Sequence, residues 1–119
     1  MDLERVVKDI EDHLMPGLKL DVIERALYHY FFRHTRLLGK ETGLFPLLPV
    51  ASAVGISEWS ARERVRSMHQ KGCIRIEERN KNGHVIRIVL PEEIPGLVPD
   101  GAQRPAIDVE SLDFFTGRK

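Results

Sequence analysis

The stretch from residue 46 to residue 90 constrains the fold of this chain more than any other part of the sequence. Gly55 and Gly72 each follow a run with helical character, at the position where a left-handed backbone ends a helix. Ser57 suits the N-cap of the helix between them. The sequence therefore predicts a short helix, a tight turn and a longer helix.

Pro49 is expected as the first residue of the short helix, where its missing N–H costs no hydrogen bond. Residues 44–47 before it are predicted to form a short strand. On the longer helix, apolar side chains recur at helical spacing and should point inward. These side chains are Ala61, Val65 and Met68.

A β-hairpin is predicted next, and its register follows from which residues would face each other. A two-residue loop, Asn82-Gly83, would place Glu77 opposite Ile88. A three-residue loop, Lys81-Asn82-Gly83, pairs like with like, and because such cross-strand pairs stabilise sheets we expect this register. The expected pairs are Ile76 with Ile88, Ile74 with Leu90, and Glu77 with Arg87.

The N-terminal part is predicted to hold two more helices. Residues 3–14 are amphipathic and are followed by Pro16 and Gly17, which should end the first helix. Asp21 and Glu24 match a capping pattern, so a second helix should run from there to about Leu37. Its expected core stripe is Ile23, Ala26, Leu27, Tyr30 and Phe31.

Tyr28 and Phe32 form a second apolar patch on another side of that helix. A helix that is apolar on two sides must cover both. Another part of the chain could cover the patch, or the patch and the N-terminal helix could form the interface of a homodimer.

This arrangement resembles the winged helix-turn-helix domains of bacteria and phages, in which a helix-turn-helix is followed by a basic hairpin, the wing. The residues that carry the resemblance are Ala51, Gly55, Ile56, Ser57, Ala61 and Val65. It implies an α+β fold with a three-helix core, a β-hairpin wing, an extra N-terminal helix and an extended C-terminal tail. The expected boundaries are residues 1–17 for the helix, 18–90 for the domain and 91–119 for the proline-rich tail.

The distribution of charge supports a nucleic-acid partner, although the net charge is zero. Residues 58–87 hold eight basic and four acidic side chains, whereas residues 1–15 hold two and five, and residues 91–119 hold three and six. Basic residues gathered in one segment are typical of a surface that binds double-stranded DNA.

The candidate DNA-binding residues lie on the longer helix and on the hairpin. Arginines near the start of such a helix can contact guanine or phosphate. The candidates on the helix are Ser57, Trp59, Ser60, Arg62 and Arg66. The candidates on the hairpin are Arg75, Arg79 and Arg87 on its outer side and Lys81 at its tip, with His84 as a further contact.

Two features of the helix permit another interpretation. Glu58 with Arg62 and Glu63 with Arg66 could form surface ion pairs worth only a few tenths of a kcal/mol. Trp59 could be a buried anchor or an exposed side chain, and its place off the inward stripe favours exposure.

Other kinds of chemistry find no support in the sequence. The five histidines are scattered, and no Cys–His group has metal-ligand spacing, so neither a metal nor another cofactor is expected. No nucleophile motif or phosphate loop is present, which argues against an enzyme. Cys73, the single cysteine, should be buried. One cysteine allows no internal disulfide, and no apolar run is long enough to span a membrane, so a cytoplasmic protein is expected.

Three functions are consistent with these observations. The first is a sequence-specific DNA-binding module of a transcriptional regulator or of a replication or mobile-element protein. The second is a winged-helix module that binds another protein, which an apolar, charge-balanced helix face would favour. The third is the DNA-targeting part of a larger nuclease, because the ending IDVESLDFFTGRK resembles the lead-in to HNH-type nuclease domains, although the nuclease motif itself is missing.

Overall fold

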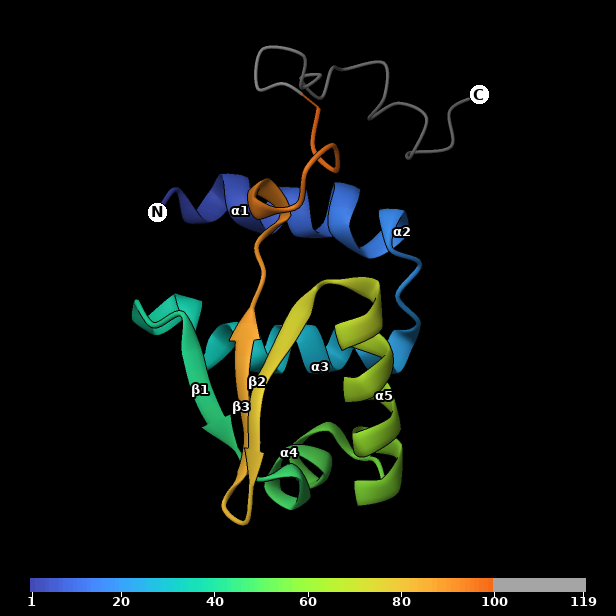
Figure 1. The fold of residues 1–119 in the computed structure, drawn as a ribbon. Coiled ribbons are helices and arrows are strands. Elements are labelled where there is room, and N and C mark those ends of the chain that lie inside the picture. Colours follow the sequence, from blue (N-terminus) through green and yellow to red (C-terminus); the bar gives the residue numbers. More distant parts are fainter. Residues whose placement is uncertain (100–119) are drawn as a thin grey trace.

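The computed structural model describes residues 1–99, which form an α+β fold (Figure 1). This confirms the expected fold class. The predictions for the tail beyond residue 99, including its resemblance to nucleases, lie outside the described residues. In chain order the main elements are α1 (Leu3–Asp9), α2 (Met15–Gly17), α3 (Val22–Arg33), β1 (Thr42–Phe45), α4 (Leu47–Val54), α5 (Glu58–Lys71), β2 (Ile74–Asn80) and β3 (Gly83–Ile88).

The N-terminal helix ends at Gly17, as predicted, but it is not a uniform α-helix. A π-helical segment, Ile10–Leu14, connects α1 to α2, and the N–H of Met15 reaches back to the carbonyl of Ile10. Pro16, which has no N–H to donate, follows directly. The apolar side of this helix joins the hydrophobic core.

Helix α3 begins with the predicted capping box. Asp21 accepts a hydrogen bond from the N–H of Glu24, and Glu24 accepts one from the N–H of Asp21. The helix ends at Arg33 rather than Leu37, because the chain turns into a 3₁₀ segment at Arg36–Leu38.

The expected core stripe of α3 is only partly correct. Leu27 and Phe31 are buried, whereas Ile23 and Tyr30 are half-buried and Ala26 is exposed. Burial is centred on the side of the helix that also carries Glu24, Tyr28 and Phe32.

The segment between α3 and α5 is displaced by two residues from its prediction. The strand is Thr42–Phe45, and α4 begins at Leu47 with Pro46 before it in an extended conformation. Pro49 is therefore the third helical residue. This position tolerates proline because the N–H groups of the first turn have no partner within the helix.

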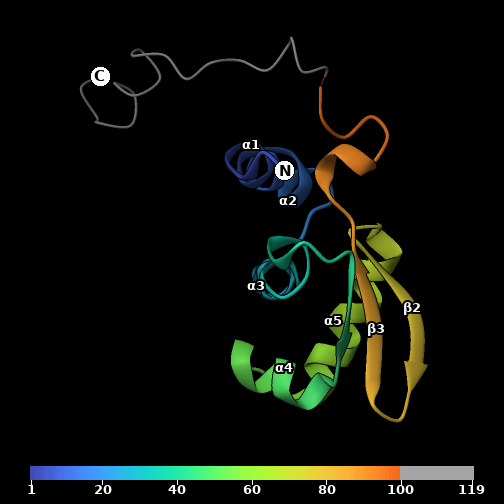
Figure 2. The same cartoon turned by 90° about the vertical axis from the view of Figure 1, so that its left-hand side faces the viewer.

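The strands form one antiparallel sheet in the order β1-β3-β2. Its inner side, with α3 and α5, encloses the hydrophobic core, and the hairpin tip lies at the same end as α4 (Figures 1 and 2). Ile74, Ile86 and Ile88 contribute to this core. Cys73 is also buried, and burial raises the pKa of its thiol to about 12.

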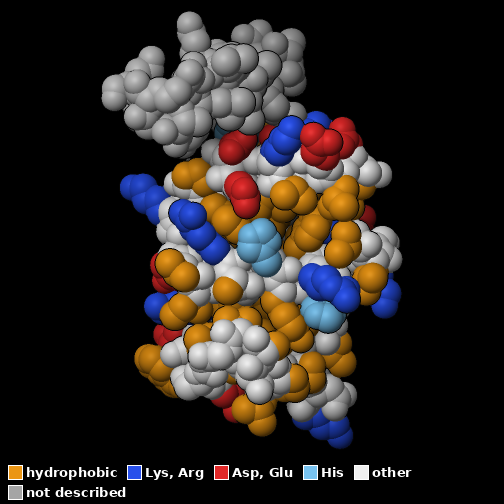
Figure 3. All heavy atoms as spheres, turned by 180° about the vertical axis from the view of Figure 1, so that it is seen from behind, with side chains coloured by type: hydrophobic (Ala, Val, Ile, Leu, Met, Phe, Trp, Pro, Cys, Tyr) orange, Lys and Arg blue, Asp and Glu red, His pale blue; other side chains and the backbone are white. Residues whose placement is uncertain are grey.

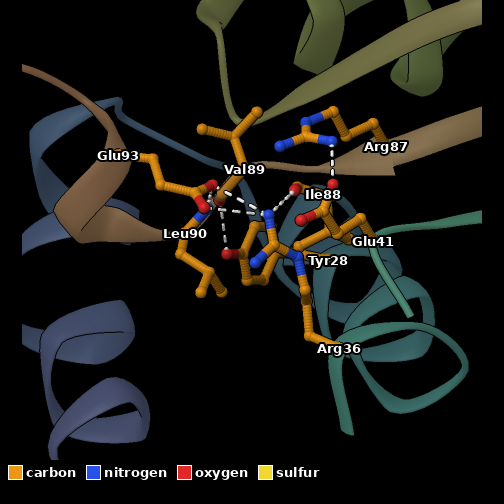
Figure 4. A network of polar contacts seen from close by, with 8 residues as sticks. All are labelled: Tyr28, Arg36, Glu41, Arg87, Ile88, Val89, Leu90 and Glu93. Atoms are coloured by element: carbon orange, nitrogen blue, oxygen red, sulfur yellow. Dashed lines mark hydrogen bonds and ion pairs between the residues drawn. The ribbon is translucent and has the colours of Figure 1, made fainter. Parts of the chain in front are cut away.

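Tyr28 and Phe32 are buried within the chain itself, so the intramolecular alternative holds and these two side chains offer no surface to a second subunit. The Tyr28 hydroxyl donates to the carbonyl of Val89 at 2.8 Å. Beside it, Arg36 donates to the carbonyl of Ile88 and to the carboxylate of Glu93 (Figure 4). These contacts tie α3 to the end of β3.

The chain after β3 packs back onto the domain. Pro91 is buried and opens a 3₁₀ turn, and Ile94 and Leu97 lie against the core. Glu92 pairs with Arg5 of α1 at 3.0 Å. Within residues 1–99 no helix is both long and apolar enough to cross a membrane.

Replacing Tyr28 with phenylalanine should lower the free energy of unfolding by about 1–2 kcal/mol, because the buried carbonyl of Val89 loses its donor. Urea denaturation would measure this change. Tyr30→Phe is the matched control: its hydroxyl has no hydrogen bond within residues 1–99, so a shift within about 0.5 kcal/mol is expected. Equal effects of the two substitutions would contradict the structural role of the Tyr28 bond.

Glu24→Gln should destabilise the fold by about 2 kcal/mol, because buried Glu24 pairs with Lys71 at 2.7 Å. Burial alone would raise the pKa of Glu24, but hydrogen bonds from Lys71, Ser67 and the Asp21 backbone lower it overall. The carboxylate therefore stabilises the fold above its ordinary pKa of 4.5, and this contribution is lost as the pH falls below that value.

Urea denaturation of Glu24→Gln and the parent chain across pH would test this expectation, and the difference between them should shrink on acidification. Glu4→Gln, which breaks the exposed Glu4–Lys8 pair, is the control and should cost no more than about 0.5 kcal/mol. A difference that does not change with pH would contradict the assignment.

Candidate nucleic-acid interface

Helix α5 is held against the start of α3 by two ion pairs. Arg64 lies 2.9 Å from the carboxylate of Asp21, and Lys71 lies 2.7 Å from that of Glu24. Ala61, Val65 and Met68 are buried, as predicted. Because its inner side is fixed in this way, α5 turns its opposite side to solvent.

The exposed side of α5 carries the predicted helix residues. Trp59 is 70% exposed, in line with the prediction, and Arg62 and Arg66 are also exposed. Ser60 is half-buried. Ser57 is the N-cap, and its hydroxyl accepts a hydrogen bond from the N–H of Ser60.

Both arginines on this side have acidic neighbours on the helix. Arg62 lies 3.0 Å from the carboxylate of Glu58, and Arg66 lies 3.3 Å from that of Glu63. Both pairs are solvent-exposed, and such pairs contribute only about 0.3–0.5 kcal/mol each. They balance the charge of the helix face but hold the arginines weakly.

The hairpin register differs from the prediction. Ile74 pairs with Ile88 and Ile76 with Ile86, whereas beyond Glu77 the pairs are Glu78 with Val85, Arg79 with His84 and Asn80 with Gly83. The prediction assumed an uninterrupted ladder, but Glu77 forms a β-bulge that adds one residue to β2. The bulge keeps isoleucines opposite one another and leaves a two-residue loop, Lys81-Asn82.

The bulge also separates the arginines that were expected to share the outer side. Side chains alternate along a strand, so one extra residue moves every later side chain to the other face. Arg75 and Arg87 face each other on the outer side, where Arg87 pairs with Glu41 at 2.6 Å. Arg79 lies instead on the side of α5, opposite His84.

A groove between α5 and the hairpin therefore collects basic side chains from both elements. The residues that line it are Arg62, Val65, Arg66, Ile76, Arg79 and His84. Towards the hairpin tip it continues into an open cleft of about 210 Å³, lined by α4, the start of α5 and Lys81. Among the described residues on the face seen from behind, basic side chains are spread between hydrophobic ones (Figure 3).

His84 has a position that the sequence did not indicate. It is only 7% exposed, because β1 packs beside it and the bulge places Arg79 opposite it. Burial lowers the pKa of its imidazole, and the charges of Arg79 and Arg62 lower it further. The groove thus contains a histidine whose surroundings favour its neutral form.

Leu48 is a residue of the cleft that sequence reasoning missed. It is 62% exposed and lines the cleft with Glu58 and Arg62. The predicted start of α4 at Pro49 left Leu48 outside the helix, so no pattern pointed to it.

Searches of the sequence against models of known protein families and against curated proteins found no match. Within residues 1–99, no group of three or more histidine, cysteine or acidic side chains could hold a metal ion.

Gly83→Ala should destabilise the fold by at least about 2 kcal/mol, because φ at Gly83 is +138° and an added Cβ would lie 2.6 Å from the nitrogen of Pro46. Thermal or urea denaturation would measure the loss. Gly39→Ala is the control, since φ is +79° there but the space around it is open, and a cost of about 1 kcal/mol is expected. If the two substitutions lower the free energy of unfolding equally, Gly83 is not in close contact with the end of β1 and Pro46.

Proposed function

We propose that this chain is a sequence-specific DNA-binding module with a winged helix-turn-helix fold. In this proposal α4 and α5 are the helix-turn-helix, and the hairpin of β2 and β3 is the wing. Helix α5 would enter the major groove, and the wing would contact the sugar–phosphate backbone. The module would belong to a transcriptional regulator or to a replication or mobile-element protein of a bacterium or phage.

The observation that carries the proposal is the groove between α5 and the hairpin. It brings arginines from two separate elements, Arg62 and Arg66 from α5 and Arg79 from β2, to one surface. Neither Arg79 nor nearby Lys81 has an ion-pair partner within the described residues. Uncompensated cations beside an exposed helix are suited to the phosphates of a duplex.

The ion pairs on α5 do not oppose this function strongly. Releasing Arg62 from Glu58 and Arg66 from Glu63 costs about 0.3–0.5 kcal/mol each, because both pairs are exposed. A bidentate contact of arginine with guanine contributes about 1–3 kcal/mol of discrimination, so the exchange favours DNA. Trp59, near the start of the helix, is available for an apolar contact with a thymine methyl group.

A second candidate function is the binding of another protein, and the same helix supports it. The paired charges together with exposed Trp59 and Leu48 make this surface partly apolar and charge-balanced. Surfaces rich in tryptophan and arginine are common at the centres of protein interfaces. The unpaired cations of the hairpin favour DNA over this alternative.

Fluorescence anisotropy with random-sequence duplex DNA across a salt series tests the proposal. We expect binding that weakens steeply with salt, because basic side chains release counterions from the phosphates they neutralise. Arg62→Ala/Arg66→Ala should weaken binding and reduce the log–log slope by about 0.9 for each phosphate that the variant no longer neutralises.

Arg33→Ala/Lys40→Ala is the matched control. It removes two exposed positive charges that have no ion-pair partner in the described residues and that lie away from α5. This variant should bind nearly as well as the parent chain. If the parent chain does not bind DNA at low salt, DNA binding is refuted and the protein-binding alternative is favoured. If both variants bind equally weakly, the interface does not lie on α5.

A further inference from the structure

The groove between α5 and the hairpin contains a largely buried histidine that has no hydrogen-bond partner within residues 1–99. His84 is 7% exposed and lines both the groove and the cleft at the hairpin tip. Its ring makes no hydrogen bond with any described residue. The ring nitrogens of His84 are not among the fully enclosed polar atoms of residues 1–99, so they reach the open groove and can bond to a ligand there.

The charges around His84 are mainly positive and come from α5, β2 and the hairpin tip, whereas β1 and α4, which also border it, contribute no charged side chain. Arg62 and Arg66 belong to α5, Arg79 lies opposite on β2, and Lys81 is at the tip. Glu58 is the one acidic residue lining the groove or the cleft within residues 1–99, and it is paired with Arg62. The site therefore has more positive charge than its own residues neutralise.

These side chains are suited to bind a phosphate group. Guanidinium groups bind phosphate oxygens through paired N–H donors, and an imidazolium adds a further donor. The groove is narrow, with a volume of about 60 Å³ between the arginines and His84, and Val65 and Ile76 form its apolar floor. This space suits one phosphate group rather than a base or a peptide.

We propose that Arg62, Arg79 and His84 form a pocket for one backbone phosphate of DNA, and that His84 takes up a proton from solvent when the phosphate binds. The inference rests on the proposed DNA-binding function and assigns one contact within it. No covalent bond of the DNA forms or breaks. The imidazole of His84 gains a proton from solvent, and the phosphodiester remains an anion.

Proton uptake follows from the electrostatics of the pocket. In the free protein, burial and the two arginines lower the pKa of His84. A bound phosphate neutralises their field and accepts a hydrogen bond from the imidazolium, which raises the pKa again. Because the bound state holds more protons, affinity should increase as the pH falls towards the ordinary histidine range, by at most about tenfold per pH unit.

The experiment measures DNA affinity by anisotropy from about pH 8 to about pH 5.5 for the parent chain and three variants. The parent chain should bind more tightly as the pH falls. His84→Gln should lose most of this dependence, because glutamine cannot take up the proton. His29→Gln, which removes an exposed histidine from α3, should retain it.

Arg79→Gln is the third variant, and it keeps the test decisive if His84→Gln fails to fold, because Arg79 is exposed. It should reduce both the pH dependence and the log–log salt slope, the latter by about 0.9. If DNA binds but the pH dependence is the same in all variants, the phosphate pocket is refuted and DNA binding stands.

Nuclear magnetic resonance of the histidine ring protons separates DNA from free phosphate as the ligand. The His84 signal is identified by its absence in His84→Gln, and its pKa is followed with duplex DNA or with inorganic phosphate. A pKa raised by DNA supports the proposal. If inorganic phosphate raises the pKa of His84 but the chain does not bind DNA, the pocket binds phosphate and DNA is refuted as its ligand. If neither ligand changes the pKa of His84, the phosphate pocket is refuted.

Discussion

The packing of α5, which buries Ala61, Val65 and Met68, determines how the candidate interface is presented, and two ion pairs with the start of α3 support it. Asp21 and Glu24 form the capping box of α3, and the same two carboxylates pair with Arg64 and Lys71 of α5. The same short acidic motif thus caps α3 and pairs with basic side chains of α5. With α5 held along its inner side, the face with Trp59 is left exposed.

The second determinant is the β-bulge at Glu77. Without it, Arg79 would lie with Arg75 and Arg87 on the outer side of the hairpin, and the groove beside α5 would have one cation fewer. With it, Arg79 faces His84 and shares the groove with Arg62. Because the bulge moves later side chains of β2 to the other face, one added residue changes the charge of the groove.

Sequence reasoning recovered the features whose physical cause is local. The capping box at Asp21, the N-cap at Ser57 and the helix end at Gly72 depend on residues within one turn, and all three are present. The inward side of α5 and the exposure of Trp59 follow from helical spacing, which the sequence also contains. On α5, therefore, helical spacing was enough to separate the buried side chains from the exposed Trp59, Arg62 and Arg66.

The hairpin and α4 could not be read in the same way, because their geometry depends on neighbours that are distant in the sequence. The register of β2 against β3 is decided by the packing of isoleucines from both strands into a shared core, and the bulge accommodates the one residue that does not fit this register. The sequence alone determined where the helices lie to within a few residues and where the basic residues concentrate, since both depend mainly on local residues. Only the tertiary structure decided that Arg79 and His84 face α5, because the face of a strand residue depends on pairing and not on its own identity.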